Sequence, residues 1–422
     1  MSISLRQKLD LDRSVLNSGH EKLRKRTTEL DSASQDLKYT SGDSFLAFVN
    51  DASVSEQIAK LVKEKCPSQL PKAVFVVGIG GANLASKAIY DALIGYAEAV
   101  YDLDRKMIFL DTVDEAISEP VMLYLNNLKS PEEFVIVVVS KSGTTLETLA
   151  NTEFLVSRLE KKFGDIIQRI VIMSQEGSPL AIEARAKGIT FMEMPKALSD
   201  RFLAFSPLTL LPLALYGIIF QDFLEGAKAA LSKFRSRESL PASTAVAINH
   251  FYSINFNIYD IFLFSPRLET LGKWQRQLIA ESLGKDGKGL DPTVSIGTAD
   301  LHSGLQLTLG GPENRFTTFV SVKEHSDETL GDSSLDILSE KISSKPAGDI
   351  NAAILRSVQE TYFKRNLPFA DIVLDKISLS DLGQYMIYAM LQTVFLGTLM
   401  NVDVYSQPSV EEYKQLARKS LE

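Results

Sequence analysis

Short runs of β-branched and aliphatic residues recur along this chain, and a stretch of helical length follows each of them. The first four runs read "AVFVVGIG", "MIFLDT", "EFVIVVVS" and "RIVIMS", and segments such as 84–100 and 145–163 lie between them. Each run is apolar at successive positions, which is the pattern of a strand that is buried on both faces. The alternation therefore predicts a parallel sheet with helices on both sides.

A second set of strand-like runs follows, with the sequences "NIYDIFLFS", "TVSIGT", "RFTTFVSV" and "ADIVLD". Segments near 266–283, 350–364 and 379–400 have the length and periodicity of helices. With 422 residues, the chain is long enough to form two domains of ordinary size. We expect two α/β domains of similar size.

The polar stretch around 225–245 predicts the border between these two domains. We expect an N-terminal helical arm at 1–40, a first α/β domain at 41–230, a second at 231–400 and a C-terminal helix at 401–422.

Composition narrows the possible partners. The net charge of -8 argues against a nucleic acid or an anionic membrane as the main partner, although a local basic pocket could still bind an anion. The apolar segment 202–220 has the length of a membrane span, but its prolines and glycine favour a helix buried in an α/β domain.

The single cysteine, Cys66, excludes an intrachain disulfide and suits a reducing, cytoplasmic location, and the N-terminus lacks a signal-peptide core. The four histidines show no HxxxH spacing, so no metal site is expected.

A glycine cluster follows the first predicted strand, in "VVGIGGANLASKAI". Glycines allow a ligand to approach the backbone closely, and the free N–H groups at the start of the next helix favour an anion. An ordinary tight turn between strand and helix explains the pattern equally well. A dinucleotide-binding loop would need a glycine at the position of Asn83.

The loop "SKSGTT" at 140–145 follows a buried strand and precedes a helix. It combines four hydroxyl groups with a lysine and the N–H groups of a helix N-terminus, which together suit a phosphate monoester. Ordinary helix capping would explain one of the hydroxyls. The order of residues differs from that of a Walker loop, so the sequence predicts a phosphate site without nucleotide hydrolysis.

Glu281 stands near the end of the predicted helix at 271–283, just before a loop rich in glycine. A carboxylate is unfavourable at a helix C-terminus, which already carries partial negative charge. The glycines are expected to leave this carboxylate facing an open cleft, whereas a solvated surface glutamate is the alternative. Lys285 and Lys288 are expected to be solvated loop charges.

Together, these motifs resemble the long-form glucose-6-phosphate isomerase family. The segments "GIGGANL", "SKSGTTLET", "ESLGKDGKG" and "GTADLHSGLQ" occur in the order of the family, and "SQPSVEEYKQLARK" is similar to its C-terminal motif. The resemblance implies two doubly wound parallel-sheet sugar-isomerase (SIS) domains. It also implies reversible isomerisation of glucose 6-phosphate and fructose 6-phosphate, in glycolysis and gluconeogenesis, through a cis-enediolate.

The resemblance assigns roles to individual side chains. Glu281 becomes the base, His302 and Lys414 the ring-opening pair, and Arg201 the group that stabilises the developing negative charge. The residues expected to bind the phosphate and the sugar are Ser140, Lys141, Ser142 and Thr145, and Gly81, Thr148 and Gln407, respectively.

Two positions depart from the family's usual pattern. Arg201 lies in "SDRFL" where the family has "GGRYS", and the spacing to the following "LLP" supports its alignment. Ala82 stands where the family has a serine, which removes one polar contact to the substrate. The resemblance further implies a homodimer in which each histidine enters the partner's active site, and no cofactor.

Other functions remain as alternatives. A related isomerase could have an altered substrate preference and also accept mannose 6-phosphate, and a sugar-phosphate-binding regulator could keep the phosphate loop alone. A nicotinamide-dependent dehydrogenase would use "GIGGAN" to bind its dinucleotide. A transaldolase would need a Schiff-base lysine in an apolar pocket, and no lysine in the sequence clearly meets that need.

Overall fold

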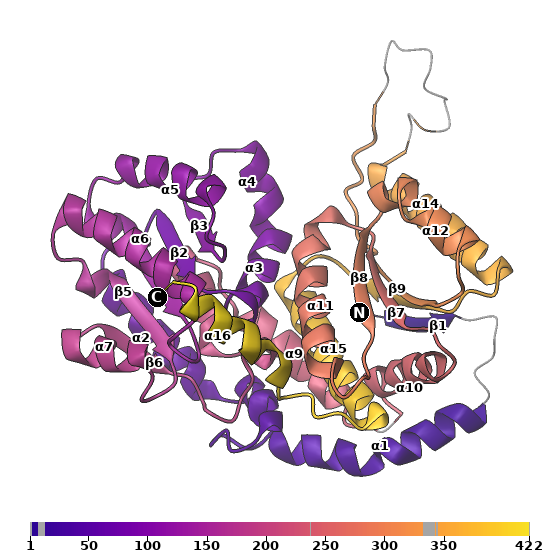
Figure 1. Ribbon diagram of the computed structural model, residues 1–422. Coiled ribbons are helices and arrows are strands. Elements are labelled where there is room, and N and C mark those ends of the chain that lie inside the picture. The colour runs from indigo at the N-terminus through magenta and orange to yellow at the C-terminus, as the bar shows by residue number, and fades with distance from the viewer. Residues whose placement is uncertain (1, 7–12, 237, 332–341, 343–344, 422) are drawn as a thin grey trace. The chain divides into compact units, whose positions relative to one another are not determined.

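The computed structural model describes residues 2–6, 13–236, 238–331, 342 and 345–421. The chain divides into two compact units, each built from two separate segments (Figure 1). Unit 1 comprises Met1–Thr27 and Ala229–Val404, and unit 2 comprises Thr28–Lys228 and Tyr405–Glu422.

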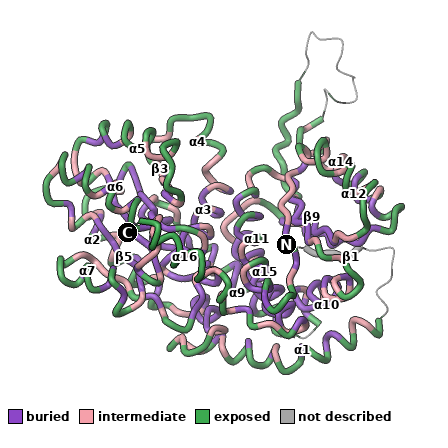
Figure 2. Tube along the Cα trace, in the orientation of Figure 1, coloured by how far each residue is buried: buried purple, intermediate pink, exposed green. Residues whose placement is uncertain are grey.

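Unit 2 contains a parallel sheet with the strand order β3-β2-β4-β5-β6. Its strands are β2 (Ala73–Val77), β3 (Lys106–Leu110), β4 (Phe134–Val139), β5 (Ile170–Ser174) and β6 (Thr190–Glu193). Every residue of β2, β4 and β5 is buried, as their continuous apolar runs predict (Figure 2). The edge strand β6 was not predicted, because three of its residues are partly buried, Glu193 is exposed, and the strand lacks such a run.

Helices cover both faces of this sheet. The helices of unit 2 are α2 (Ala52–Lys65), α3 (Leu84–Tyr90), α4 (Tyr96–Val100), α5 (Glu115–Asn127), α6 (Leu146–Phe163), α7 (Pro179–Lys187), α8 (Pro207–Tyr216) and α16 (Glu411–Lys419). One face of β2 and β4 packs against α5, α6 and α7, through residues such as Phe75, Ile136 and Leu155. The apolar segment around 207–216 forms the buried helix α8, as predicted.

Unit 1 contains a second sheet, with the strand order β1-β10-β9-β7-β8. The strands β7 (Ile258–Leu263), β8 (Asp291–Ile296), β9 (Arg315–Val322) and β10 (Phe369–Leu374) are parallel. The strand β1 (Ser2–Arg6) pairs antiparallel with the edge of β10. The prediction of a purely helical N-terminal arm was wrong for this strand. Its short sequence gives no periodic signal of its own, and its pairing depends on a partner at the far end of the chain.

The helices of unit 1 supply the rest of its core. They are α10 (Leu240–Ser253), α11 (Glu269–Leu283), α12 (Leu305–Gly310), α14 (Ala347–Lys364) and α15 (Leu379–Met400). Two helices contain a boundary between the units within their sequence. They are α1 (Arg13–Ala33) and α9 (Gln221–Lys233). The predicted α/β class with two parallel sheets is confirmed. In the part of the chain that is described, no helix is both long and apolar enough to cross a membrane.

Candidate active site

The glycine cluster forms a tight turn at the carboxyl end of β2. Gly80 has a positive φ of 64°, and the short 3-10 helix Gly80–Ala82 leads into α3. A Cβ atom placed on Gly81 would lie 2.5 Å from the backbone nitrogen of Arg201. Only glycine therefore fits at this position, because the turn packs directly on the backbone of residues 200 and 201.

Asn83 closes the same turn from inside. Its Nδ2 donates a hydrogen bond of 2.7 Å to the carbonyl oxygen of Gly78, and the residue is fully buried. The Asn83 side chain thus stabilises the turn without a ligand.

The predicted phosphate loop lies at the carboxyl end of β4, the neighbour of β2 in the sheet. Ser140 is buried, its Oγ lies 3.0 Å from Thr145 Oγ1, and it accepts a hydrogen bond of 3.2 Å from the Gly143 N–H. Thr145 occupies the N-cap position of α6 without a side-chain capping bond. The N–H groups at the start of this long helix therefore remain suited to an anion.

Lys141 supplies a positive charge beside this loop. Its Nζ donates a hydrogen bond of 2.5 Å to the carbonyl oxygen of Leu198, which precedes the segment containing Arg201. Burial lowers the pKa of the Lys141 ammonium, the neighbouring Asp200 raises it, and Arg201 lowers it. The loop thus has a cation at its base that is partly removed from water.

Thr148 lies one turn into α6 and is almost completely buried. Among the described residues, its Oγ1 has no hydrogen-bond partner. A buried hydroxyl without a partner costs free energy, so such an atom beside a candidate site is suited to a ligand oxygen.

Arg201 and Gln407 meet although they are 206 residues apart in the sequence. Arg201 is 1% exposed, and its Nη1 donates a hydrogen bond of 2.7 Å to Gln407 Oε1. Its Nη2 donates a second bond of 3.2 Å to the carbonyl oxygen of Ser406. Unit 2 thus brings together three residues expected at the site, since Gly81 packs on the backbone of Arg201.

Lys414 lies on α16, in the last segment of unit 2. Its Nζ lies 2.8 Å from Glu411 Oε1, in an ion pair that is largely exposed. Such surface pairs contribute little, typically about 0 to 1 kcal/mol. This ion pair therefore restrains the Lys414 side chain only weakly.

Unit 1 carries the expected base, Glu281, in the last turn of α11. Gln277 Nε2 donates a hydrogen bond of 2.9 Å to Glu281 Oε2. The sequence analysis missed Gln277, although its spacing of four residues on one helix face was a usable signal. The amide orients the carboxylate from within the same helix.

The lysines that follow Glu281 bind carbonyl groups. Lys285 is buried, and its Nζ donates to the carbonyl oxygens of Ser282 at 2.7 Å and Asp403 at 2.5 Å. Lys288 Nζ donates to the carbonyl oxygen of Met400, at 2.9 Å. The expectation of a solvated Lys285 was wrong. Its ammonium binds the Ser282 carbonyl in the last turn of α11, where a positive charge is favourable.

His302 ends the short 3-10 helix Ala299–His302, which follows β8. The side chain is exposed, at the carboxyl end of a parallel strand where α/β sheets place ligands. Unit 1 thus holds Glu281 and His302 on separate elements, and the other residues expected at the site all belong to unit 2.

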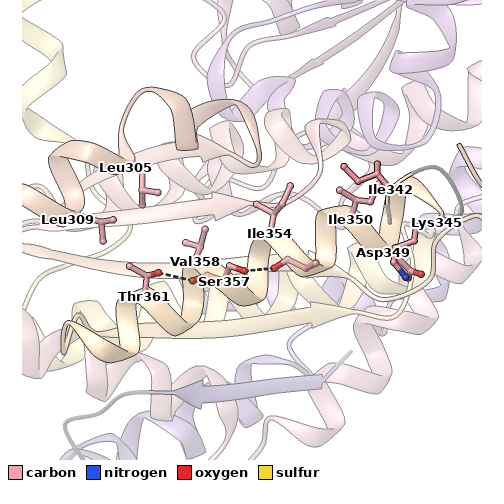
Figure 3. Close-up of a pocket in the computed structure, with 11 residues that line it drawn as sticks. Leu305, Leu309, Ile342, Lys345, Asp349, Ile350, Ile354, Ser357, Val358 and Thr361 are labelled. Atoms are coloured by element: carbon pink, nitrogen blue, oxygen red, sulfur yellow. Dashed lines mark hydrogen bonds between the residues drawn. The ribbon is translucent and has the colours of Figure 1, made fainter. Parts of the chain in front are cut away.

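A pocket of about 470 Å³ lies in unit 1, between α12 and α14 (Figure 3). Apolar side chains such as Leu305, Ile354 and Val358 line it. The hydroxyls of Ser357 and Thr361 donate to carbonyls of their own helix, at 2.9 and 2.8 Å. Its hydroxyls are engaged, its walls are mostly apolar, and the charge of Lys345 is matched by that of Asp349, so this pocket is poorly suited to a sugar phosphate. It contains none of the residues expected at the site.

The geometry defines a class of protein. A glycine turn and a Ser/Thr/Lys loop follow neighbouring strands of a parallel sheet, as in α/β proteins that hold an anionic ester at the strand ends. Across the described residues, no cluster of His, Cys, Asp and Glu side chains is arranged to hold a metal ion.

Comparison with known proteins makes the class specific. Residues 60–311 match the family model described as phosphoglucose isomerase. A probable glucose-6-phosphate isomerase of Haloarcula marismortui is 34% identical over 359 residues, which cover 82% of this chain and 77% of the relative. The glucose-6-phosphate isomerase of Methanocaldococcus jannaschii is 32% identical over 348 residues, covering 81% of this chain and 82% of the relative. The chain belongs to the phosphoglucose isomerase family.

Solved structures agree on the fold. The crystal structure of a hypothetical protein from Thermus thermophilus superimposes with a TM-score of 0.85 at 26% identity, and the match covers 100% of both chains.

Proposed function

We propose that this protein catalyses the reversible isomerisation of glucose 6-phosphate and fructose 6-phosphate. Family membership supports the reaction. In this chain, the loop after β4 supports the proposal most directly. Ser140, Thr145 and the start of α6 offer hydroxyl and N–H donors to one anion there. The buried hydroxyl of Thr148, without a hydrogen-bond partner among the described residues, adds a donor for the sugar.

The first chemical step is ring opening. A proton leaves the anomeric hydroxyl and another reaches the ring oxygen, so that the C–O bond of the ring breaks and a carbonyl forms. A histidine and a cationic lysine suit this transfer, and we assign it to His302 and Lys414.

The second step moves a proton between C2 and C1. We assign it to Glu281, because one carboxylate can remove the proton from one carbon and return it to the other on the same face of the cis-enediolate. The hydrogen bond from Gln277 to Glu281 Oε2 orients the carboxylate for this transfer. No electrons leave the substrate, so the step balances without a redox partner.

The negative charge of the enediolate requires a fixed cation. Arg201 is buried and hydrogen-bonded to Gln407 and Ser406, so its guanidinium is already oriented. It also remains protonated at any physiological pH, and we assign charge stabilisation to it.

The proposal includes a cytoplasmic homodimer in which His302 of each chain serves the partner's site. The exposed position of His302 supports such an arrangement, and a single cysteine is in keeping with a reducing compartment.

Purified protein incubated with fructose 6-phosphate tests the function. We expect glucose 6-phosphate to form, measured by a coupled dehydrogenase assay, with mannose 6-phosphate quantified in the same samples. Binding of fructose 6-phosphate without either product would identify a sugar-phosphate-binding regulator instead.

A further inference from the structure

The helix α16, which carries Lys414, buries little of its own surface. None of its nine residues is buried, and Tyr413 and Leu416 are 57% and 56% exposed. Apolar packing therefore does little to fix the position of this helix within unit 2. A different interaction is needed to hold Lys414 in a defined place.

Arg418 provides this interaction. Its Nη2 donates to Thr144 Oγ1 at 2.8 Å and to the Thr144 carbonyl oxygen at 3.1 Å. Thr144 belongs to the phosphate loop and lies 274 residues earlier in the chain. Within the described part of the chain, these two bonds are the hydrogen bonds that join a side chain of α16 to another element.

The contact also fixes the direction of the hydroxyl groups in the loop. A guanidinium can only donate, so Thr144 Oγ1 must accept from Arg418 and turn its own proton elsewhere. That proton points to Ser142 Oγ, which lies 3.1 Å away, and the Thr144 N–H donates to the same oxygen at 3.3 Å. With its oxygen accepting twice, the Ser142 hydroxyl has its proton left for a ligand.

Lys414 and Arg418 are four residues apart on one helix, so they lie on the same face. The face that reaches the phosphate loop through Arg418 is therefore the face that carries Lys414.

We propose that Arg418 is a positioning residue that ties the ring-opening lysine to the phosphate loop. It holds α16 against Thr144 and orients the Ser142 hydroxyl towards the phosphate, so the same contact serves both binding and ring opening. The inference rests on the proposed function, because the roles of Lys414 and the loop come from it.

The test compares Arg418→Ala and Arg418→Lys with Lys419→Ala, an exposed lysine on the same helix. For Arg418→Ala we expect kcat for fructose 6-phosphate to fall about three- to tenfold and the Kd for 6-phosphogluconate to rise about threefold, the range for an exposed, charge-assisted hydrogen bond. Arg418→Lys keeps a cation that can donate to both oxygens, so we expect it to retain at least half of the activity. Lys419→Ala should behave as the unmodified protein, and the melting temperature should be unchanged in all three because α16 buries no residue.

A double-mutant cycle with Thr144→Val identifies the contact. If Arg418 acts through the Thr144 hydroxyl, Arg418→Ala should lower kcat/KM less in the Thr144→Val protein than alone. Fully additive effects, or an unchanged kcat in Arg418→Ala, would overturn the inference while leaving the isomerase activity established. An unmodified protein that binds 6-phosphogluconate but turns over no fructose 6-phosphate would instead refute the proposed function.

Discussion

The loop after β4 and the loop after α11 are both short and contain glycine, but they are held in different ways. In the loop at 140–145, Ser140 bonds to Gly143 and Thr145, its own near neighbours. In the loop at 284–289, Lys285 bonds to Asp403, 118 residues away, and Lys288 to Met400. The Ser140 hydroxyl of the first loop bonds within the loop, and Lys141 and Thr144 add contacts to Leu198 and Arg418. The second loop is held by lysines that bind carbonyls at and just after the end of α15. We therefore expect substitutions in the first to weaken binding and those in the second to impair the base and the stability of unit 1.

The largest effect is expected at the base itself. Glu281→Gln keeps the shape and the contact with Gln277 but cannot accept a proton, so kcat should fall by about 100- to 10,000-fold, the range for loss of a general base. The Kd for 6-phosphogluconate should stay within about threefold. A variant with near-normal turnover would remove Glu281 from the mechanism.

A second large effect is expected at Lys285. Lys285→Met keeps the apolar stem but leaves the carbonyls of Ser282 and Asp403 without this donor, so the free energy of unfolding should fall by about 2 to 3 kcal/mol. Denaturant unfolding would measure the loss. Lys288→Met is the matched control, because Lys288 is exposed and should lose less than about 1 kcal/mol. Equal losses in the two variants would contradict the distinction between a buried and an exposed lysine.

A third effect concerns the loop at 140–145. The double variant Ser140→Ala with Thr145→Ala should raise KM for fructose 6-phosphate at least tenfold, since each hydrogen bond to a charged phosphate contributes about 1.5 to 3 kcal/mol. Ser157→Ala, on the exposed side of α6, is the control and should leave KM unchanged. An unchanged KM in the double variant would place the phosphate elsewhere.

The smallest effect is expected at Ala82. Its side chain is buried in the glycine turn, where the family has serine. Ala82→Ser would restore a donor, and we expect kcat/KM to rise several-fold, a gain of about 1 kcal/mol. A fall in steady-state kcat/KM would show that the turn is built around alanine, and would make a different substrate preference worth testing.

The sequence predicted what is locally encoded. Continuous apolar runs indicated the central strands of both sheets, and the hydroxyls at 140–145 indicated the anion-binding loop, because strand burial and helix N-termini leave their pattern in neighbouring residues. The edge strands β1 and β6 were not predicted, because neither has a continuous apolar run, whereas the edge strands β3 and β8 were predicted from theirs.

Contacts between residues that are far apart in the sequence could not be predicted. The need for glycine at position 81 arises from the backbone of Arg201, and the burial of Lys285 arises from the carbonyl of Asp403. Neither cause is visible in the local sequence. Gln277 is different, because its position one helical turn before Glu281 was available and was overlooked.

The central claim is proton transfer through a carboxylate, and isomerisation in heavy water tests it most directly. A proton held on Glu281 can exchange with solvent before it returns, so glucose 6-phosphate formed from fructose 6-phosphate should carry a measurable fraction of deuterium at C2, detected by NMR. The Glu281→Gln protein should produce no deuterated glucose 6-phosphate above background. Rapid isomerisation by the unmodified protein with no deuterium at C2 would indicate a direct hydride shift and would contradict the account.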